Sequence, residues 1–157
     1  MKQDVYARLR ELNLELPAPP AIGDLYTPVM PFAENLLYLS GVGPNIPGRT
    51  HYSGKVGKDL TIAEGQDAAK AAALNLLANL HAAIGDLNRV KRIVKVLGFV
   101  NCGPDFYDQP QVINGASALL IDLFGEPGRA ARSAVGMIAL PTNIPVEIEA
   151  LVELEKL

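Results

Sequence analysis

The sequence is poor in the residues that build disulfides and metal sites. Its 157 residues include one cysteine, two histidines and no tryptophan. A single cysteine excludes an intrachain disulfide, and this set is too small for a Cys/His metal site. The glycine clusters at 41–43 and 54–57 show no strand–loop–helix setting with a phosphate-binding lysine. We therefore expect no metal and no cofactor.

Positive charge and long apolar runs are also scarce. The net charge is −3 and the pI is about 5.4, which argues against a dedicated nucleic-acid-binding protein. The densest basic run, at 89–92, is short enough to be one polar edge of a strand. No apolar run approaches the roughly 18 residues of a membrane span, and no signal-peptide pattern opens the chain. These absences predict a cytoplasmic protein without a membrane or nucleic-acid partner.

What the chain does contain predicts one globular domain over residues 1–157. Hydrophobic residues make up 49% of it, which is enough for a substantial core at this length. An amphipathic helix is predicted over 4–14, capped by Asp4, and the prolines that follow from residue 17 end it. Residues 1–19 are therefore expected to form a helical extension laid against the main body.

The C-terminal 26 residues carry the clearest pattern. From Ile144 onward apolar residues alternate with glutamates, and this period of two predicts a β-strand with one buried face. A second apolar run covers 133–140, and Pro141–Asn143 between the two runs is typical of a turn. We therefore predict a β-hairpin, in which Glu147 lies opposite a residue near Gly136.

Two helices are predicted in the middle of the chain. Thr61 and Glu64 form a capping box, which begins a helix with an alanine-rich buried stripe that ends at Gly85. A second helix is predicted to begin near 108–110, with proline in its first turn. The predicted strands in this part are 26–32, 36–39 and 90–100, and a glycine- and proline-rich loop covers 42–60.

This order of elements predicts an α+β two-layer sandwich. One mixed sheet would carry both main helices on one face, and the N-terminal helix would be added to that body. The other face of the sheet would then stay exposed. Because an exposed apolar face favours a partner, we infer that the chain associates with copies of itself.

Several stretches resemble the YjgF family, also called the Rid or reactive-intermediate-deaminase family. The strongest combines Ala131–Val135, Leu140–Pro141 and Val146–Ala150, which set an arginine, a Leu-Pro turn and a Glu-x-Glu at fixed spacing. The other matching stretches are Pro20–Gly23 with Tyr26, Leu37–Gly41, Gly85–Val90, and Val94–Val100 with Asp105 and Phe106. The likeness spans roughly residues 20–155 and implies the chorismate-mutase-like fold of that family.

The resemblance also implies an assembly and an activity. It implies a homotrimer with a cleft between neighbouring subunits, which would cover the exposed sheet face. It implies hydrolysis of 2-imino acids and their enamine tautomers to 2-keto acids and ammonia, so that the partner is a small molecule with a carboxylate. The longer N-terminal helix and 42–60 loop place the chain in a longer branch, and Ala134 stands where many members carry a cysteine.

The site residues follow from the same resemblance. The family's carboxylate-binding arginine falls on Arg132, and its glutamate near the attacking water falls on Glu147. A guanidinium is a planar fork that can hold a carboxylate through two hydrogen bonds, and a carboxyl with a raised pKa can position water or deliver a proton. The cleft-lining positions of the family fall on Tyr26, Ser40 and Asn114.

Other interpretations stay open. On spacing alone, Arg132 and the glutamates of the last strand could line one cleft or form a solvated outer face, in which Glu149 and Glu153 are placed like Glu147. Three functions are compatible with the chain: an imine deaminase, a protein that binds a carboxylate metabolite without turnover, and a ribonuclease, against which the acidic pI counts. Cys102 is not favoured as a nucleophile, because no histidine lies near it in sequence.

Overall fold

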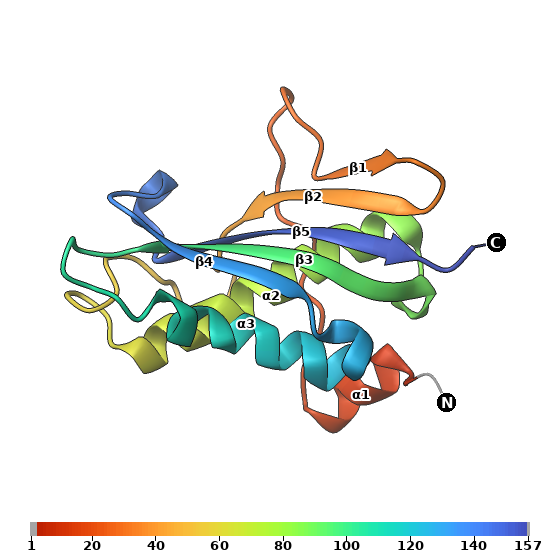
Figure 1. Ribbon diagram of the computed structural model, residues 1–157, viewed down its shortest axis with the longest axis horizontal. Coiled ribbons are helices and arrows are strands. Elements are labelled where there is room, and N and C mark those ends of the chain that lie inside the picture. The colour runs from red at the N-terminus through yellow and green to blue at the C-terminus, as the bar shows by residue number, and fades with distance from the viewer. Residues whose placement is uncertain (1–2, 157) are drawn as a thin grey trace.

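The computed structural model describes residues 3–156, which form a five-stranded sheet with two long helices on one face (Figure 1). The strands are β1 (Val29–Phe32), β2 (Leu36–Val42), β3 (Val90–Asn101), β4 (Ala131–Met137) and β5 (Val146–Leu154). The helices are α1 (Val5–Glu11), α2 (Ile62–Ile84) and α3 (Gln109–Phe124), with 3-10 turns at Leu87–Arg89, Glu126–Gly128 and Pro141–Asn143. The predicted α+β sandwich with an added N-terminal helix is confirmed.

The sheet order is β1-β2-β5-β3-β4, so the prediction of a C-terminal hairpin is wrong. β3 lies between β4 and β5, parallel to β4 and antiparallel to β5. The turn at Pro141–Asn143 is present, but it joins two strands that do not pair. The physical reason is the crossover through α3, which returns the chain beside β3 and parallel to it. Glu147 therefore pairs with Phe99 of β3 and not with a residue near Gly136.

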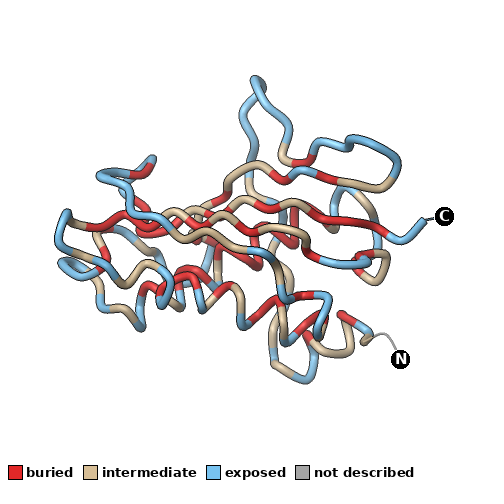
Figure 2. Tube along the Cα trace, in the orientation of Figure 1, coloured by how far each residue is buried: buried red, intermediate tan, exposed pale blue. Residues whose placement is uncertain are grey.

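The two faces of the sheet differ in composition. The residues of β5 that face the helices are at most 7% exposed and are Val146, Ile148, Ala150, Val152 and Leu154. Between them Glu147, Glu149 and Leu151 point to the open face and are partly exposed. Neighbouring strands add exposed apolar side chains to this face, among them Tyr38 and Val135. Figure 2 shows the buried segments gathered where the helices meet the sheet. That a second copy covers the open face stays a prediction.

The position of α3 is set by its packing on α2. The predicted capping box begins α2, because Thr61 Oγ1 accepts a hydrogen bond from Glu64 N at 3.2 Å and the Glu64 carboxylate accepts from Thr61 N at 2.7 Å. Gly85 ends that helix in the left-handed conformation, with φ 78°. On α3, a Cβ at Gly115 would lie 2.1 Å from the carbonyl oxygen of Gln66 in α2. The two helices therefore pack backbone against backbone, and α3 is held above β3 and β4.

The N-terminal helix is shorter than predicted. Asp4 caps it as expected, but α1 ends at Glu11 because Asn13 adopts a positive φ of 53°. Val5 and Leu9 are buried, and Figure 1 shows α1 lying against the C-terminal half of α3. None of the helices within residues 3–156 combines the length and the hydropathy needed to cross a membrane.

The strand boundaries near the predicted site also differ slightly from expectation. β1 begins at Val29, three residues later than predicted, and β2 continues to Val42. Residues 43–60 form the expected loop, which an isolated bridge between Val56 and Cys102 ties to the end of β3. β1 and β2 thus form an antiparallel pair, and β2 extends far enough along the sheet to lie beside Glu147 of β5.

Candidate functional site

Arg132 lies on the edge strand β4, and its side chain turns toward α3. Its backbone pairs with Val96 of β3, a residue on the helix-facing side of the sheet. Arg132 Nη1 donates to Asn114 Oδ1 at 2.8 Å and to Ser117 Oγ at 3.1 Å. Asn114 and Ser117 are three residues apart on α3, so they share one helical surface. The structure therefore brings together Arg132 and Asn114, two of the residues that were expected at the site.

These two hydrogen bonds leave one edge of the guanidinium open. Within the residues that the structure describes, Nε and Nη2 of Arg132 have no hydrogen-bond partner. The contacts through Nη1 fix the plane of the fork before any ligand arrives. An open, oriented Nε–Nη2 edge is the geometry that accepts a carboxylate through two parallel hydrogen bonds.

A cavity of about 330 Å³ lies beside this guanidinium. It is bounded by α3, by the turn that precedes β4, and by Arg132 itself. Its polar lining comes from Arg132, Asn114, Ser117 and Arg129, and apolar side chains such as Leu120 complete it. This combination of a small volume, an apolar part and a few fixed polar groups suits a small organic anion.

Glu147 lies near the start of β5, on the open face of the sheet. Its side chain is half-buried, and burial raises the pKa of the Glu147 carboxyl above its usual range. The nearby Glu149 carboxylate raises this pKa further. Gly41 of β2 leaves room for this carboxyl, because a Cβ at residue 41 would lie only 2.1 Å from Glu147 Oε1. Among residues 3–156 no group donates a hydrogen bond to Glu147, so its oxygens are available to water or to a ligand.

The three glutamates of β5 are equivalent in the sequence pattern but have different surroundings in the structure. Glu149 accepts a hydrogen bond from Tyr38 Oη at 2.9 Å, and Glu153 forms ion pairs with Lys91 at 2.8 Å and Arg92 at 2.5 Å. Glu149 and Glu153 are therefore each bound by a neighbouring side chain, whereas Glu147 has no such partner among the described residues. In each case a side chain from a neighbouring strand reaches across the open face to bind the carboxylate.

Ser40 and Tyr26 belong to the same end of the sheet as Glu147. Ser40 precedes Gly41 in β2, and its Oγ donates to the carbonyl oxygen of Thr27 at 2.6 Å. This bond fastens the segment before β1, in which Tyr26 is 55% exposed. Ser40 thus holds the backbone next to Tyr26 rather than presenting its hydroxyl to Glu147.

The expected residues form two separate groups on opposite faces of the sheet. Arg132 pairs with Val96, which in turn pairs with Ala150, and these residues lie on the helix side of the sheet. Glu147 pairs with Phe99, on the open side. The two residues are two strands apart and three positions apart along the strands, so their Cα atoms are about 14 Å apart. The expectation that Arg132 and Glu147 line one cleft is not met within a single chain.

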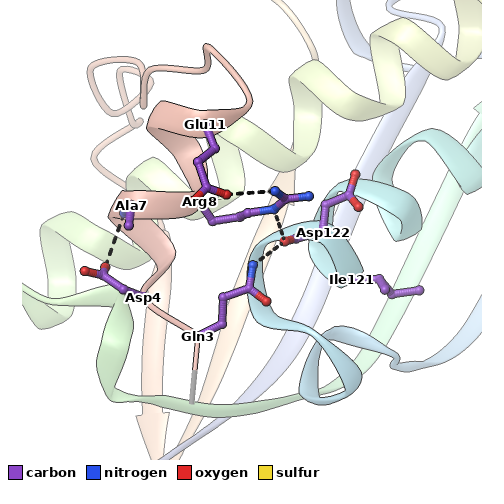
Figure 3. A pocket seen from close by; sticks show the side chains of 7 residues that line it. All are labelled: Gln3, Asp4, Ala7, Arg8, Glu11, Ile121 and Asp122. Carbon is purple, nitrogen blue, oxygen red and sulfur yellow. Dashed lines mark hydrogen bonds and ion pairs between the residues drawn. The ribbon is translucent and has the colours of Figure 1, made fainter. Parts of the chain in front are cut away.

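A larger cavity lies elsewhere and contains none of the expected site residues. Its volume is about 430 Å³, and it lies between α1 and the end of α3 (Figure 3). Gln3 Nε2 and Arg8 Nε both donate to the carbonyl oxygen of Asp122, at 2.8 and 3.1 Å. Arg8 also binds Glu11 at 2.8 Å. These bonds join the N-terminal segment to α3.

Neither Cys102 nor His51 lines the Arg132 cavity. Cys102 is 4% exposed and its Sγ lies 3.6 Å from Gln109 Nε2, while His51 lies exposed in the 43–60 loop. Within residues 3–156 no three His, Cys, Asp or Glu side chains come together as ligands for a metal ion.

Sequence reasoning missed Ser117 and Gly41. Ser117 holds Arg132 together with Asn114, and its position three residues further along the helix was the available signal. Gly41 lies inside one of the stretches that carried the family resemblance, but its contact with Glu147 depends on how β2 and β5 pair. A sequence does not show that pairing.

Known proteins with this sequence pattern and fold support one assignment. The family described as "YjgF/chorismate mutase-like, putative endoribonuclease" matches residues 6–154. Protein TCP17 of Trypanosoma cruzi is 44% identical over 151 residues, which are 96% of this chain and 94% of that protein. The crystal structure of Atu1372, a protein of unknown function from Agrobacterium tumefaciens, is 45% identical, covers 96% of this chain and 92% of its own, and has a TM-score of 0.88. E. coli TdcF, solved with bound serine, is 24% identical over 90% of this chain and 96% of its own, with a TM-score of 0.59, and shares the fold. The chain therefore belongs to the YjgF/chorismate mutase-like family.

Proposed function

We propose that the protein hydrolyses 2-imino acids to 2-keto acids and ammonia, in a site that two copies of the chain form together. The observation that carries this proposal is the guanidinium of Arg132, which Asn114 and Ser117 hold through one nitrogen while the Nε–Nη2 edge stays open beside a cavity. In this proposal that edge binds the carboxylate of the substrate. TdcF, which shares the fold, was solved with serine, a ligand that also carries a carboxylate.

Glu147 supplies the second part of the chemistry. A water molecule attacks the carbon of the C=N bond, the nitrogen gains protons, and the C–N bond breaks to release ammonia and leave the keto acid. Burial keeps part of the Glu147 carboxyl population protonated closer to neutral pH than for an exposed glutamate. Its protonated form can donate to the imine nitrogen and its ionised form can orient the attacking water.

The opposite faces of Arg132 and Glu147 require a second copy in this proposal. In one chain the two side chains point away from each other, on either side of the sheet. The open face that carries Glu147 also carries partly exposed Phe99 and exposed Val135, which gives a second copy an apolar surface to bury. The homotrimer implied by the family resemblance would place Glu147 of one copy against Arg132 of the next.

The first test is turnover of imino acids generated in place. 2-Iminopropanoate and 2-iminobutanoate are formed by an amino-acid oxidase or dehydratase, and keto-acid and ammonia release is followed with wild type, Arg132→Ala and Arg10→Ala. Wild type and Arg10→Ala should accelerate release, and Arg132→Ala should not. Arg10 is the matched control because it is exposed on α1 and outside the Arg132 cavity.

A second variant separates turnover from simple binding. Glu147→Gln should lose turnover and still bind 2-oxobutanoate, the product, in calorimetry. If Glu147→Gln keeps both turnover and keto-acid binding, Glu147 has no part in the mechanism. If wild type binds the keto acid but accelerates no imine, the protein is a carboxylate-binding protein without turnover.

A further inference from the structure

A second guanidinium lines the cavity beside Arg132. It belongs to Arg129, three residues earlier in the chain, in the turn between α3 and β4. Arg129 Nε donates to both carboxylate oxygens of Glu126, at 3.0 and 3.2 Å. Among the residues described by the structure, Nη1 and Nη2 of Arg129 have no hydrogen-bond partner. Glu126 therefore occupies one edge of this guanidinium and leaves its terminal nitrogens for a ligand.

The turn that carries Arg129 is tightly built. Gly128 is buried, and a Cβ at that position would lie 2.1 Å from the carbonyl oxygen of Leu120 in α3. The backbone amide of Arg129 donates to the carbonyl oxygen of Glu126 at 3.0 Å, and that of Gly128 donates to Gly125 at 2.9 Å. Because the turn is pressed onto α3 and closed by its own hydrogen bonds, the base of the Arg129 side chain is fixed relative to Asn114 and Arg132.

Two guanidinium groups around one small cavity favour an anion with two charges. Glu126 is not part of the cavity lining, and that lining contains no carboxylate side chain. A substrate with one carboxylate can pair with Arg132 and leaves Arg129 without a partner inside the cavity. A substrate with two carboxylates can pair with both, and each charge-assisted contact adds to affinity and to discrimination.

We propose that the preferred substrates are 2-imino dicarboxylic acids of four or five carbons, with the carboxylate next to the imine on Arg132 and the distal carboxylate on Arg129. This assignment rests on the proposed function, because it places the substrate in the same cavity. It makes Arg129 the residue that determines specificity for acidic substrates.

The experiment compares substrates and variants as ratios. Values of kcat/KM are measured for 2-iminosuccinate and 2-iminoglutarate, generated from aspartate and glutamate by an amino-acid oxidase, and for 2-iminobutanoate. Wild type should prefer the dicarboxylic substrates by about tenfold, mainly through KM, and Arg129→Ala should remove that preference. Glu126→Ala, which removes the acceptor now bound to Arg129 Nε, should increase the preference. Arg10→Ala removes an exposed positive charge away from the cavity and should keep the wild-type ratio.

A binding measurement distinguishes failure of this inference from failure of the proposed function. Oxaloacetate, 2-oxoglutarate and 2-oxobutanoate are titrated into wild type and Arg129→Ala by calorimetry. Tighter binding of the two dicarboxylates that depends on Arg129, without turnover of any imine, would overturn the deaminase proposal and uphold the dicarboxylate site. Equal affinity for all three keto acids, or a preference that Arg129→Ala leaves intact, would overturn the dicarboxylate site whatever the turnover.

Discussion

Gly41 and Glu147 are in contact on the open face of the sheet, and the absence of a side chain on Gly41 permits that contact. A Cβ at residue 41 would stand 2.1 Å from Oε1 of Glu147 and 3.0 Å from its Cδ. No described residue holds the Glu147 carboxyl through a hydrogen bond, so its place depends on the space beside β2. Gly41 is therefore a positioning residue for Glu147 in the proposed mechanism.

Gly41→Ala should displace the Glu147 carboxyl and lower kcat/KM for 2-iminobutanoate by about a hundredfold, since a shift of about 1 Å in a catalytic group can cost that much. Keto-acid binding through Arg132 should persist, because Asn114 and Ser117 still hold that guanidinium. Gly103→Ala is the matched control, since nothing lies within 4 Å of a Cβ at Gly103. A Gly41→Ala protein with wild-type kcat/KM would show that the position of Glu147 does not matter for the reaction.

Glu147→Gln should change how stability depends on pH. Burial raises the pKa of Glu147 in the folded protein, so the folded state holds this proton more tightly than the unfolded state does. Ionisation therefore lowers stability as pH rises from the unfolded pKa, near 4.5, through the higher folded pKa. Urea unfolding at equal protein concentration should find Glu147→Gln more stable than wild type at about pH 7.5, with the difference gone at about pH 3.5.

Glu153 on the same strand provides a control of opposite sign. The hydrogen bond from Lys91, together with Arg92, holds the pKa of Glu153 below its usual range. The stability that it contributes is present above the unfolded pKa and is lost as pH falls through the lower folded pKa. Glu153→Gln should thus be less stable than wild type at about pH 7.5 and converge with it in acid. The same trend with pH for both variants would exclude this account of Glu147.

The helices could be predicted from the sequence because their signals are local. The capping box at Thr61 and Glu64 and the left-handed Gly85 lie at the two ends of α2 as expected. Period-two alternation from Ile144 also identified β5 and its buried face correctly. In each case, the residues that decide the structure are neighbours in sequence.

The strand order could not be predicted because it depends on a distant element. A turn at Pro141–Asn143 between two apolar runs is typical of a hairpin, yet β3 pairs with both runs and separates them. Apolar residues on both sides of β3 are compatible with any position inside a sheet. The family resemblance pointed to both Arg132 and Glu147. Only the strand pairing, Arg132 with Val96 and Glu147 with Phe99, shows that one chain holds them on opposite faces of the sheet.

Tyr6 joins α1 to the main body through two hydrogen bonds. Its hydroxyl accepts from the backbone amide of Leu87 at 2.8 Å and shares a hydrogen bond with His81 Nδ1 at 2.9 Å. Leu87 is 0% exposed, so Tyr6→Phe leaves a buried amide without a partner and should cost about 1–3 kcal/mol of unfolding free energy. Tyr107→Phe is the control, because Tyr107 is 77% exposed. Equal urea midpoints for the two variants would mean that these bonds do not contribute to the docking of α1.

The two-copy site makes a prediction that no single-chain site shares. Arg132→Ala chains keep Glu147, and Glu147→Gln chains keep Arg132, so each variant alone should be inactive. When the two are co-expressed in equal amounts and assemble at random, about a quarter of the shared sites should receive an intact arginine from one copy and an intact glutamate from the other. Imine hydrolysis by the mixture should therefore recover to about a quarter of the wild-type rate per site. A site built within one chain would recover nothing, because every chain in the mixture lacks one of the two side chains. Mass spectrometry of the intact assemblies checks that mixed species have formed, so an inactive mixture that contains them would overturn the two-copy site.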